Sequence, residues 1–248
     1  MSETPLLEVD GIAKQFRGLR AVDGVGFTVP RGSIVALIGP NGAGKTTVFN
    51  LIAGVYRPDT GRVLLDGADI TGRHPDEVCN AGIGRTFQIV RPFGELSVLD
   101  NVLVGALRQN HEVAAARRTA MGVLERLGLA DKAASPAKSL TLPERKRLET
   151  ARALATGPKL LLLDEVMAGL RPTEIDHLVA TFRALCRETG LTILLTEHVM
   201  RAVMALSQKI VVLHHGQKIC EGAPEMVARD PIVLESYLGG AGHRAASA

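Results

Sequence analysis

The stretch GPNGAGKTT, residues 39–47, has residue types and a spacing suited to holding phosphate groups. It matches the pattern G-x-x-x-x-G-K-[ST], follows a β-branched run at 33–39 and opens a helical pattern at 45–54. Backbone N–H groups of such a loop wrap phosphates, and the helix N-terminus adds the positive end of its dipole. Lys45 is placed to reach the β- and γ-phosphates of a nucleotide, and the Thr46 hydroxyl is placed to ligate Mg²⁺. The predicted nucleotide site consists of Gly39, Pro40, Asn41, Gly42, Ala43, Gly44, Lys45, Thr46 and Thr47.

Two adjacent carboxylates follow a second apolar run, in the stretch LLLLDE at 160–165. A phosphate site needs a metal ligand and a group that positions water, and a buried strand that ends in Asp-Glu supplies both. We expect Asp164 to hold Mg²⁺ through its coordination shell and Glu165 to act as the general base toward the attacking water. The alternative is an ordinary strand end with two solvated acids, which the phosphate loop in the same chain disfavours.

The composition of the 248-residue chain argues against several classes of function. Apolar residues make up 46% of the chain, enough for a sizeable core in one large domain or two small ones. Aromatic residues make up 3% with no Trp, which argues against a platform that stacks single-stranded bases. The net charge of +3 is too small to indicate nucleic acid as the main partner. Because the three cysteines, Cys79, Cys186 and Cys220, form no C-x-x-C pair, we expect reduced thiols in a cytosolic protein.

The chain carries no pattern that predicts export or membrane insertion. Its start, MSETPLLEVD, lacks the basic and apolar segments of a signal peptide. Its longest aliphatic runs, such as 160–163, fall far below the roughly 18 residues that span a bilayer. We therefore expect a protein that is soluble by itself and reaches a membrane only through membrane partners.

Strand patterns alternate with helical patterns along the chain, which predicts an α/β fold with a mainly parallel sheet. The predicted elements are strands at 33–39, 159–165, 191–198 and 209–216, a hairpin at 61–70 turning at Asp66-Gly67, and helices at 45–54 and 172–188. Helical patterns fill residues 89–157. The predicted division is an ATPase domain at 1–240, with an α/β core at 1–88 and 158–240 and a helical subdomain at 89–157, and a flexible tail at 241–248.

The order and spacing of these motifs resemble those of the nucleotide-binding subunits of ABC transporters, over about residues 6–239. LIGPNGAGKTT is close to the phosphate loop of that family. GRTFQ places Gln88 at the Q-loop glutamine, which in the family contacts Mg²⁺ and water and senses the membrane subunits. TEHVM places His198 at the switch histidine, which contacts the γ-phosphate. Phe16, in GIAKQF, lies where an aromatic ring stacks on adenine, with a core position as the alternative.

The resemblance implies a fold, a function and a set of partners. The implied fold is a P-loop NTPase, with a RecA-like core, an antiparallel β edge and an inserted α-helical subdomain. The implied function is Mg²⁺-dependent ATP hydrolysis that drives a membrane importer from the cytoplasmic face of the inner or plasma membrane. The implied partners are membrane permease subunits, a second ATP-binding subunit and, indirectly, a solute-binding protein. The second ATP-binding subunit is either another copy of this chain or a sister ATPase.

Two long stretches resemble the branched-chain amino acid branch of these transporters more closely. They are GRTFQIVRPFGELSVLDNVLVGA and EHVMRAVMALSQKIVVLHHGQKICEGAPEMVARDPIVLESYLG. Related branches move urea, short amides and other small polar solutes, so the resemblance leaves the transported solute open within this group.

The signature segment of the family, L-S-G-G-Q, aligns with residues 140–144, which read LTLPE here. In the family this segment faces the ATP of the opposite subunit, so Thr141 is the expected donor to that nucleotide. Pro143 has no N–H to donate. Since a hydrogen bond to a charged group contributes about 1.5–3 kcal/mol, its uncompensated loss predicts hydrolysis slower by roughly one to two orders of magnitude at that half-site. The Thr141 hydroxyl and the helix dipole are available to compensate.

Local helix chemistry explains how the same segment tolerates a proline. Thr141 and Glu144 have the S/T-x-x-E spacing of a capping box, and Pro143 falls in the first turn, where a missing N–H is harmless. The basic triplet that follows, 145–147, is interpreted as an interface and solvent feature. Downstream of Glu165, Val166 replaces a common Pro, and Arg171 replaces a usual Asp or Asn in the D-loop.

Two other classes of function compete with the importer motor. An ABC ATPase acting on DNA or ribosomes usually carries coiled-coil arms or two cassettes in one chain, and neither pattern is present. A small-molecule kinase would need its own substrate pocket and no signature helix.

Overall fold

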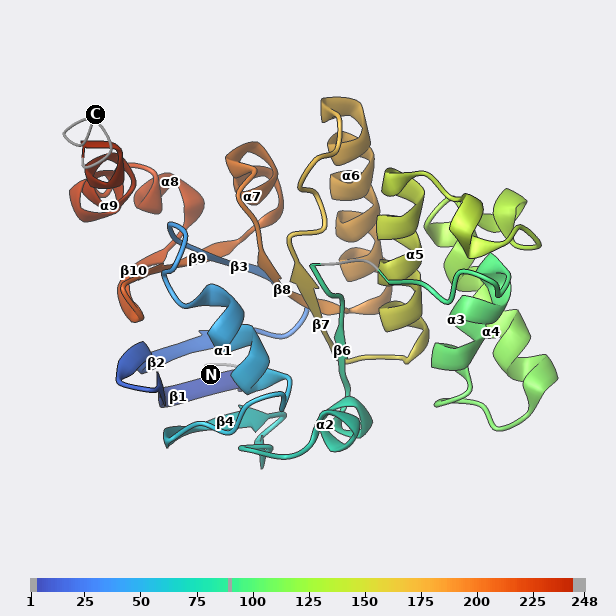
Figure 1. Ribbon diagram of the computed structural model, residues 1–248, viewed down its shortest axis with the longest axis horizontal. Helices are drawn as coiled ribbons and strands as arrows, with labels where there is room; N and C mark the ends of the chain where they lie inside the picture. Colours follow the sequence, from blue (N-terminus) through green and yellow to red (C-terminus); the bar gives the residue numbers. More distant parts are fainter. Residues whose placement is uncertain (1–3, 89–90, 243–248) are drawn as a thin grey trace.

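The computed structural model describes residues 4–88 and 91–242, which fold into two sheets and a helical unit (Figure 1). The larger sheet has six strands in the order β10-β9-β3-β8-β7-β6. All of its neighbouring strands run parallel except β10, which pairs antiparallel with β9 at the edge. Its strands are β3 (Ile34–Ile38), β6 (Ile83–Arg85), β7 (Leu160–Asp164), β8 (Thr192–Thr196), β9 (Lys209–His214) and β10 (Gln217–Gly222).

The smaller sheet is antiparallel and has the order β2-β1-β4-β5. Its strands are β1 (Leu7–Phe16), β2 (Leu19–Val29), β4 (Thr60–Leu65) and β5 (Ala68–Asp69). Helix α1 (Lys45–Ile52) lies between the two sheets in Figure 1. One apolar core, which includes Phe49 of α1, fills the space between them.

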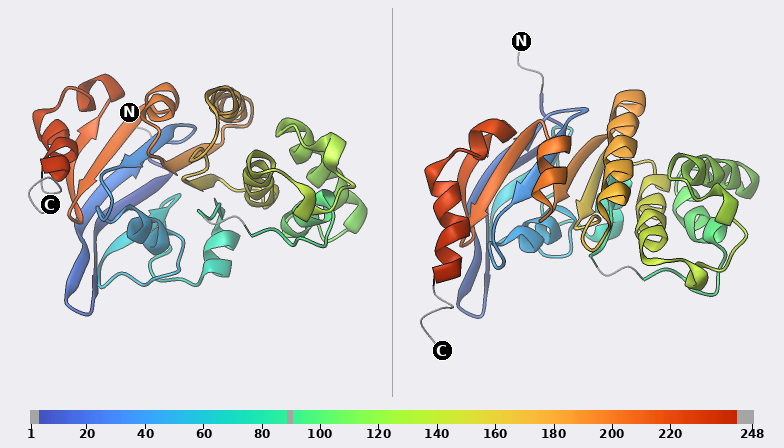
Figure 2. Two further views of the ribbon diagram at one scale, coloured as in Figure 1. Left: turned by 45° about the horizontal axis from the view of Figure 1, so that its top comes forward. Right: turned by 90° about the horizontal axis from the view of Figure 1, so that it is seen from above.

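The central strands of the larger sheet are apolar at every position because both faces of the sheet are covered. Along β3, Val35 and Leu37 point into the core shared with α1 and the smaller sheet. Ile34, Ala36 and Ile38 point into a second core on the opposite face. Helices α6 (Pro172–Thr189) and α7 (Met200–Leu206) cover that second face (Figure 2). The carboxyl ends of β3, β7 and β8 therefore meet at one edge of a rigid sheet.

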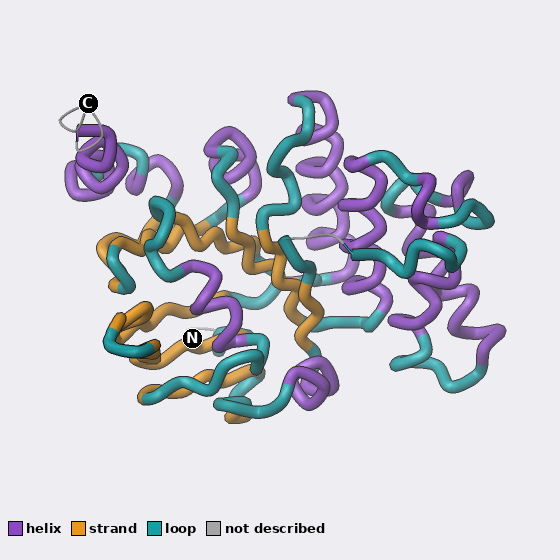
Figure 3. The backbone as a smooth tube through the Cα atoms, in the orientation of Figure 1, coloured by secondary structure: helices purple, strands orange, loops and turns teal. Residues whose placement is uncertain are grey.

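A helical unit packs beside the larger sheet and has a core of its own. It comprises α3 (Val98–Ala106), α4 (Val113–Arg126), α5 (Leu142–Ala155) and the short 3₁₀ turns Ala130–Lys132 and Ala137–Ser139. In Figure 3 these helices gather at one end of the molecule, with α5 next to α6. At the other end lie α8 (Pro224–Val227) and α9 (Pro231–Gly242), while α2 (Pro75–Ala81) precedes β6.

The predicted fold class, an α/β P-loop core with an antiparallel β edge and a helical subdomain, is confirmed. The predicted strands, hairpin and helices lie within two residues of the observed ones. Helix α9 continues through Gly242, two residues into the tail predicted at 241–248. Residues 243–248 of that tail, and residues 89 and 90 at the predicted start of the helical subdomain, lie outside the described residues.

Two features can be compared with the expectations from the sequence: the length and apolar character of the helices, and the burial of the cysteines. Among the described residues, no helix combines the length and the apolar character that crossing a bilayer requires. Within the same residues the three cysteines are unpaired, and each is half-buried rather than fully in a core. Burial raises the pKa of the Cys186 thiol to about 11, so this thiol stays protonated at neutral pH.

Candidate functional site

The phosphate loop connects β3 to α1, as its sequence predicted. Gly44 caps the helix with a left-handed backbone, so the first N–H groups of α1 face the loop. Lys45 is nearly buried, and its Nζ donates to the carbonyl oxygens of Gly39 and Pro40, at 2.7 and 3.1 Å. Burial lowers the pKa of Lys45, and the charges of Glu165 and Asp164 oppose that shift. The ammonium is therefore held inside the loop and close to both predicted carboxylates.

Two glycines of the loop leave no room for a side chain. At Gly39, with φ of 151°, a Cβ would lie 2.1 Å from the carbonyl oxygen of Leu213. At Gly44, with φ of 99°, a Cβ would lie 2.5 Å from the carbonyl oxygen of Ala21. The loop is thus pressed between β9 and β2, which fixes its shape.

Asp164 ends β7, and the strands on both sides hold its carboxylate. Thr196, at the end of β8, donates its hydroxyl to Oδ1 at 2.8 Å. Arg85, at the end of β6, donates to Oδ2 at 3.2 Å. The N–H of Asp164 donates to the Thr86 hydroxyl at 3.0 Å. These contacts fix the orientation of the buried carboxylate.

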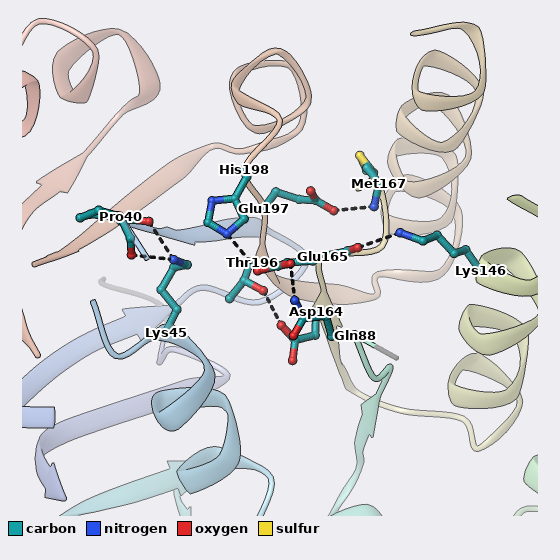
Figure 4. A network of polar contacts seen from close by, with 11 residues as sticks. Pro40, Lys45, Gln88, Lys146, Asp164, Glu165, Met167, Thr196, Glu197 and His198 are labelled. Atoms are coloured by element: carbon teal, nitrogen blue, oxygen red, sulfur yellow. Dashed lines mark hydrogen bonds and ion pairs between the residues drawn. The ribbon is translucent and has the colours of Figure 1, made fainter. Parts of the chain in front are cut away.

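Glu165 lies between Gln88 and His198, the two residues that the family resemblance singled out (Figure 4). Gln88 Nε2 donates to Glu165 Oε2 at 2.7 Å. His198 Nε2 lies 2.9 Å from Glu165 Oε1. Three residues separated by up to 110 positions in the chain therefore form one hydrogen-bonded group, with both carboxylate oxygens engaged.

Thr46, Gln88 and Asp164 line one open cavity of ≈ 500 Å³. A hydroxyl, an amide oxygen and a carboxylate are oxygen ligands of the kind that Mg²⁺ prefers, with waters completing the shell. Within residues 4–88 and 91–242, no cluster of three or more His, Cys, Asp or Glu is placed to hold a metal. The donor set fits a magnesium ion that is shared with phosphate oxygens, rather than a metal caged by protein groups alone.

Phe16 ends β1 with its ring 37% exposed, which disfavours the core alternative. Its ring packs edge-on against Tyr56, with centroids 5.2 Å apart. Phe16 pairs with Leu19 across the hairpin turn, and Ala21, two residues further on, touches the Gly44 position of the phosphate loop. The ring is therefore on the strand pair that flanks the loop, where an adenine could stack on it.

Comparison with known proteins decides the family. The ABC transporter family model matches residues 22–168, and a second model, of the branched-chain amino acid ATP-binding cassette transporters, matches residues 217–243. The chain belongs to the ATP-binding proteins of ABC transporters. It is thus an ATP-binding subunit that hydrolyses ATP to drive transport.

Curated relatives and solved structures agree with this assignment of the ABC ATPase. The high-affinity branched-chain amino acid transport ATP-binding protein BraF of Pseudomonas aeruginosa is 40% identical, over 95% of this chain and 98% of its own. LivG of Escherichia coli K12, which carries the same description, is 39% identical over the same shares. A nucleotide-free ATP-binding cassette superposes with a TM-score of 0.86 at 33% identity, covering 94% of this chain and 99% of that one. The ADP conformation of an ATP-binding cassette gives the same TM-score and identity, covering 95% and 99%.

The signature segment of this ABC ATPase lies apart from its own phosphate loop. Thr141 caps α5, and both its N–H and its hydroxyl donate to Glu144 Oε2 at 2.8 Å. Pro143 lies in the first turn of α5, as predicted. The cavity beside Thr141 is lined by α5, by α6 and by the turn that precedes α6, including Arg171. Thr141 is therefore not brought together with Lys45 of the same chain.

Two residues at the site of the ABC ATPase were missed in the sequence. Lys146 belongs to the basic triplet interpreted from the sequence as an interface and solvent feature. The solvent part of that interpretation is wrong for Lys146, because its side chain is buried against the 165–168 turn. Glu197 is buried beside His198. The sequence signal for Glu197 was its position directly before the switch histidine. The basic triplet carried no signal that showed which of its three side chains is buried.

Proposed function

We propose that this ABC ATPase powers an importer for branched-chain amino acids or related small polar solutes, from the cytoplasmic face of the inner or plasma membrane. The support is the branched-chain model that matches residues 217–243 and the names of two relatives that align along nearly their whole length. The net charge of +3 and the 3% aromatic content disfavour the alternative, an ABC ATPase acting on DNA or ribosomes.

The observation that carries the catalytic part of this proposal is the Glu165 carboxylate held between Gln88 and His198. Glu165 is the general base, because its carboxylate directly follows β7, interacts with the charge of Lys45 and can accept a proton from water. His198 holds Glu165 and would contact the γ-phosphate, while Gln88 would position the water and supply an oxygen to the metal. The hydrogen bonds to both oxygens orient the carboxylate, which matters because small displacements of a base lower the rate steeply.

Nucleotide and magnesium are assigned to the remaining site residues. Backbone groups from Gly39 to Thr47 bind the phosphates, with Lys45 on the β- and γ-phosphates and Phe16 against the adenine. Thr46, Gln88 and Asp164, which line one cavity, would hold Mg²⁺. The ion would supply charge neutralisation at the phosphates, while the residues of this chain orient the nucleotide and its water.

A second ATP-binding subunit completes each site in this proposal. Thr141 would donate to the nucleotide of that partner, and Pro143 would weaken the contact by removing one N–H. The nonstandard signature favours a sister ATPase over a second copy of this chain. The helical subdomain at 89–157, set apart from the core at 1–88 and 158–240 by its own apolar cluster, would receive the permease subunits. A solute-binding protein would deliver the cargo to those permeases.

The proposal is tested by rebuilding the transporter in liposomes, with permeases, the sister ATPase and the solute-binding protein. We expect ATP inside the vesicles to drive uptake of leucine, isoleucine or valine. We expect Lys45→Ala to abolish both nucleotide binding and uptake. Uptake of urea or short amides alone would assign the transporter to a related branch of the family. ATP-independent uptake, or salt-sensitive binding of DNA or ribosomes by the chain, would overturn the proposal.

A further inference from the structure

The catalytic glutamate has a backbone conformation that needs support. Glu165 has φ of 50°, in the left-handed region that residues with a Cβ rarely adopt. It directly follows β7, and its N–H donates to the carbonyl oxygen of Thr196 at 3.0 Å. The turn over residues 165–168 therefore sets the direction of the Glu165 side chain, and such a conformation persists only where surrounding groups hold it.

Lys146 supplies one part of that support from a different subdomain. It lies in the second turn of α5, with its side chain 7% exposed, and reaches across to the turn. Its Nζ donates to the carbonyl oxygen of Glu165 at 3.1 Å (Figure 4). It also donates to the carbonyl oxygen of Ala168 at 2.5 Å. The ammonium thus joins the first and last residues of the turn through their backbones.

Glu197, the first residue after β8, supplies the second part of the support for the 165–168 turn. Its side chain is 2% exposed, and Oε1 accepts the N–H of Met167 at 2.7 Å. Oε2 has no hydrogen-bond partner among the described residues. Burial raises the pKa of Glu197 to about 7, and the Lys146 ammonium partly opposes that rise. Three peptide groups of the 165–168 turn, those of Glu165, Met167 and Ala168, hydrogen-bond to this pair, and the backbone of His198 also stabilises the Glu197 carboxylate.

We propose that Lys146 and Glu197 are positioning residues that clamp the 165–168 turn and thereby aim the Glu165 carboxylate at Gln88 and His198. This inference deepens the proposed function and rests on Glu165 being the general base. Because Lys146 lies five residues after Thr141 on the same helix, the clamp also joins the signature segment to the catalytic carboxylate of its own chain. Movement of the helical subdomain would change the aim of Glu165 directly.

The first test is Lys146→Met in the assembled transporter, in the wild-type chain and in the Glu165→Gln chain. In the wild-type chain we expect kcat for ATP hydrolysis to fall about tenfold or more while KM for ATP stays within about twofold, since the binding loop is untouched. In the Glu165→Gln chain, we expect Lys146→Met to cause no further fall in the rate of ATP hydrolysis, because the clamp acts through the carboxylate already removed. That slow rate is measured with radiolabelled ATP over long incubations. Lys146→Arg, which keeps a cation and its donors, should recover part of the rate.

Arg147→Met is the matched control. Arg147 is the next residue of α5, and its guanidinium also donates to two backbone carbonyls, those of Leu127 and Gly128, at 3.2 and 3.0 Å. Removing it deletes similar contacts away from the turn, so kcat should stay near the wild-type value. Equal rates for the Lys146→Met and Arg147→Met chains would overturn the clamp.

A double variant separates positioning from the burial of charge. Lys146→Met alone removes the ammonium that faces the buried Glu197 carboxylate, so we expect this variant to have a lower free energy of unfolding. The double variant, Lys146→Met with Glu197→Met, removes both charges. We expect the double variant to regain unfolding stability but not turnover. Recovery of full turnover in it, or an equal loss from Lys146→Met in both Glu165 backgrounds, would show that the pair does not aim Glu165. Full turnover by the Glu165→Gln chain alone would instead refute the proposed base.

Discussion

At the level of single residues, backbone space governs the phosphate loop as much as side-chain chemistry does. Gly42 and Gly44 both have left-handed backbones, with φ of 80° and 99°. A methyl group on Gly42 would meet no described atom within 4 Å, whereas one on Gly44 would lie 2.5 Å from a backbone carbonyl of β2. Alanine substitutions at these two glycines therefore separate the cost of backbone strain from the cost of a steric clash.

We expect Gly42→Ala to lower the free energy of unfolding by about 1 kcal/mol, from backbone strain alone. Gly44→Ala should cost about 3 kcal/mol or more, because either the loop or β2 must move. Urea unfolding of the two variants beside the unaltered chain measures both. Equal losses would mean that the carbonyl of Ala21 yields at little cost.

The residues of the site differ in how far the sequence revealed them. Lys45, Thr46 and Asp164 lie in short motifs whose chemistry is local, and the structure gathers them as expected. Gln88 and His198 needed the family resemblance, because a lone Gln or His carries no signal. Lys146 could not be predicted, since only the packing of α5 against the 165–168 turn distinguishes it from its exposed-looking neighbours in the triplet.

At the level of elements, the start of α5 shows how a helix can accept a proline in its signature segment. Glu144 accepts hydrogen bonds from Thr141 and forms an ion pair with Lys132 at 3.0 Å. The hydrogen bond from the Thr141 backbone is the main cause that lowers the pKa of Glu144 to about 2. The ionised cap therefore stabilises the folded chain.

This cap predicts a pH dependence for the Glu144→Gln variant. Since the folded pKa of Glu144 is depressed from its ordinary 4.5, its contribution is present above about pH 4.5 and is lost as pH falls toward 2. We expect the unaltered chain to exceed the variant by on the order of 2 kcal/mol in unfolding free energy near neutral pH. That difference should shrink steadily below about pH 4.5 in denaturant titrations. A difference that is independent of pH would contradict the role of the ionised carboxylate.

Some elements followed from the sequence pattern and others did not. The parallel strands β3, β7, β8 and β9 are short apolar runs buried on both faces, and such runs are easy to find. The antiparallel pair β1 and β2 is longer but was not predicted strand by strand. Its register shifts around Gly11, which has φ of 57° and interrupts the alternation of apolar and polar residues.

At the level of the whole molecule, three apolar cores divide the structure. One lies between the sheets, one lies under α6 and α7, and one lies within α3, α4 and α5. A subdomain with its own core can shift as a body, which the proposed coupling of ATP hydrolysis to permeases requires. The proposed clamp at Lys146 would then transmit that shift to Glu165.

Hydrogen exchange tests whether the helical core is energetically separate. Leu124, fully buried in α4, belongs to the helical core, and Leu37, fully buried in β3, belongs to the core between the sheets. We expect Leu124→Ala, at a cost of about 2–5 kcal/mol, to speed amide exchange within 98–155 and to leave the strands protected. Leu37→Ala should instead speed exchange across both sheets. Faster exchange along the whole chain in both variants would mean a single cooperative unit.

The central claim is that the Glu165 carboxylate, held by Gln88 and His198, is the base for ATP hydrolysis. The most direct measurement is equilibrium ATP binding and steady-state hydrolysis on one preparation of the transporter assembled with the Glu165→Gln chain. We predict that the Kd for ATP stays within about threefold, while hydrolysis at this site falls by about 10²-fold or more. Unchanged hydrolysis with intact binding would contradict the claim.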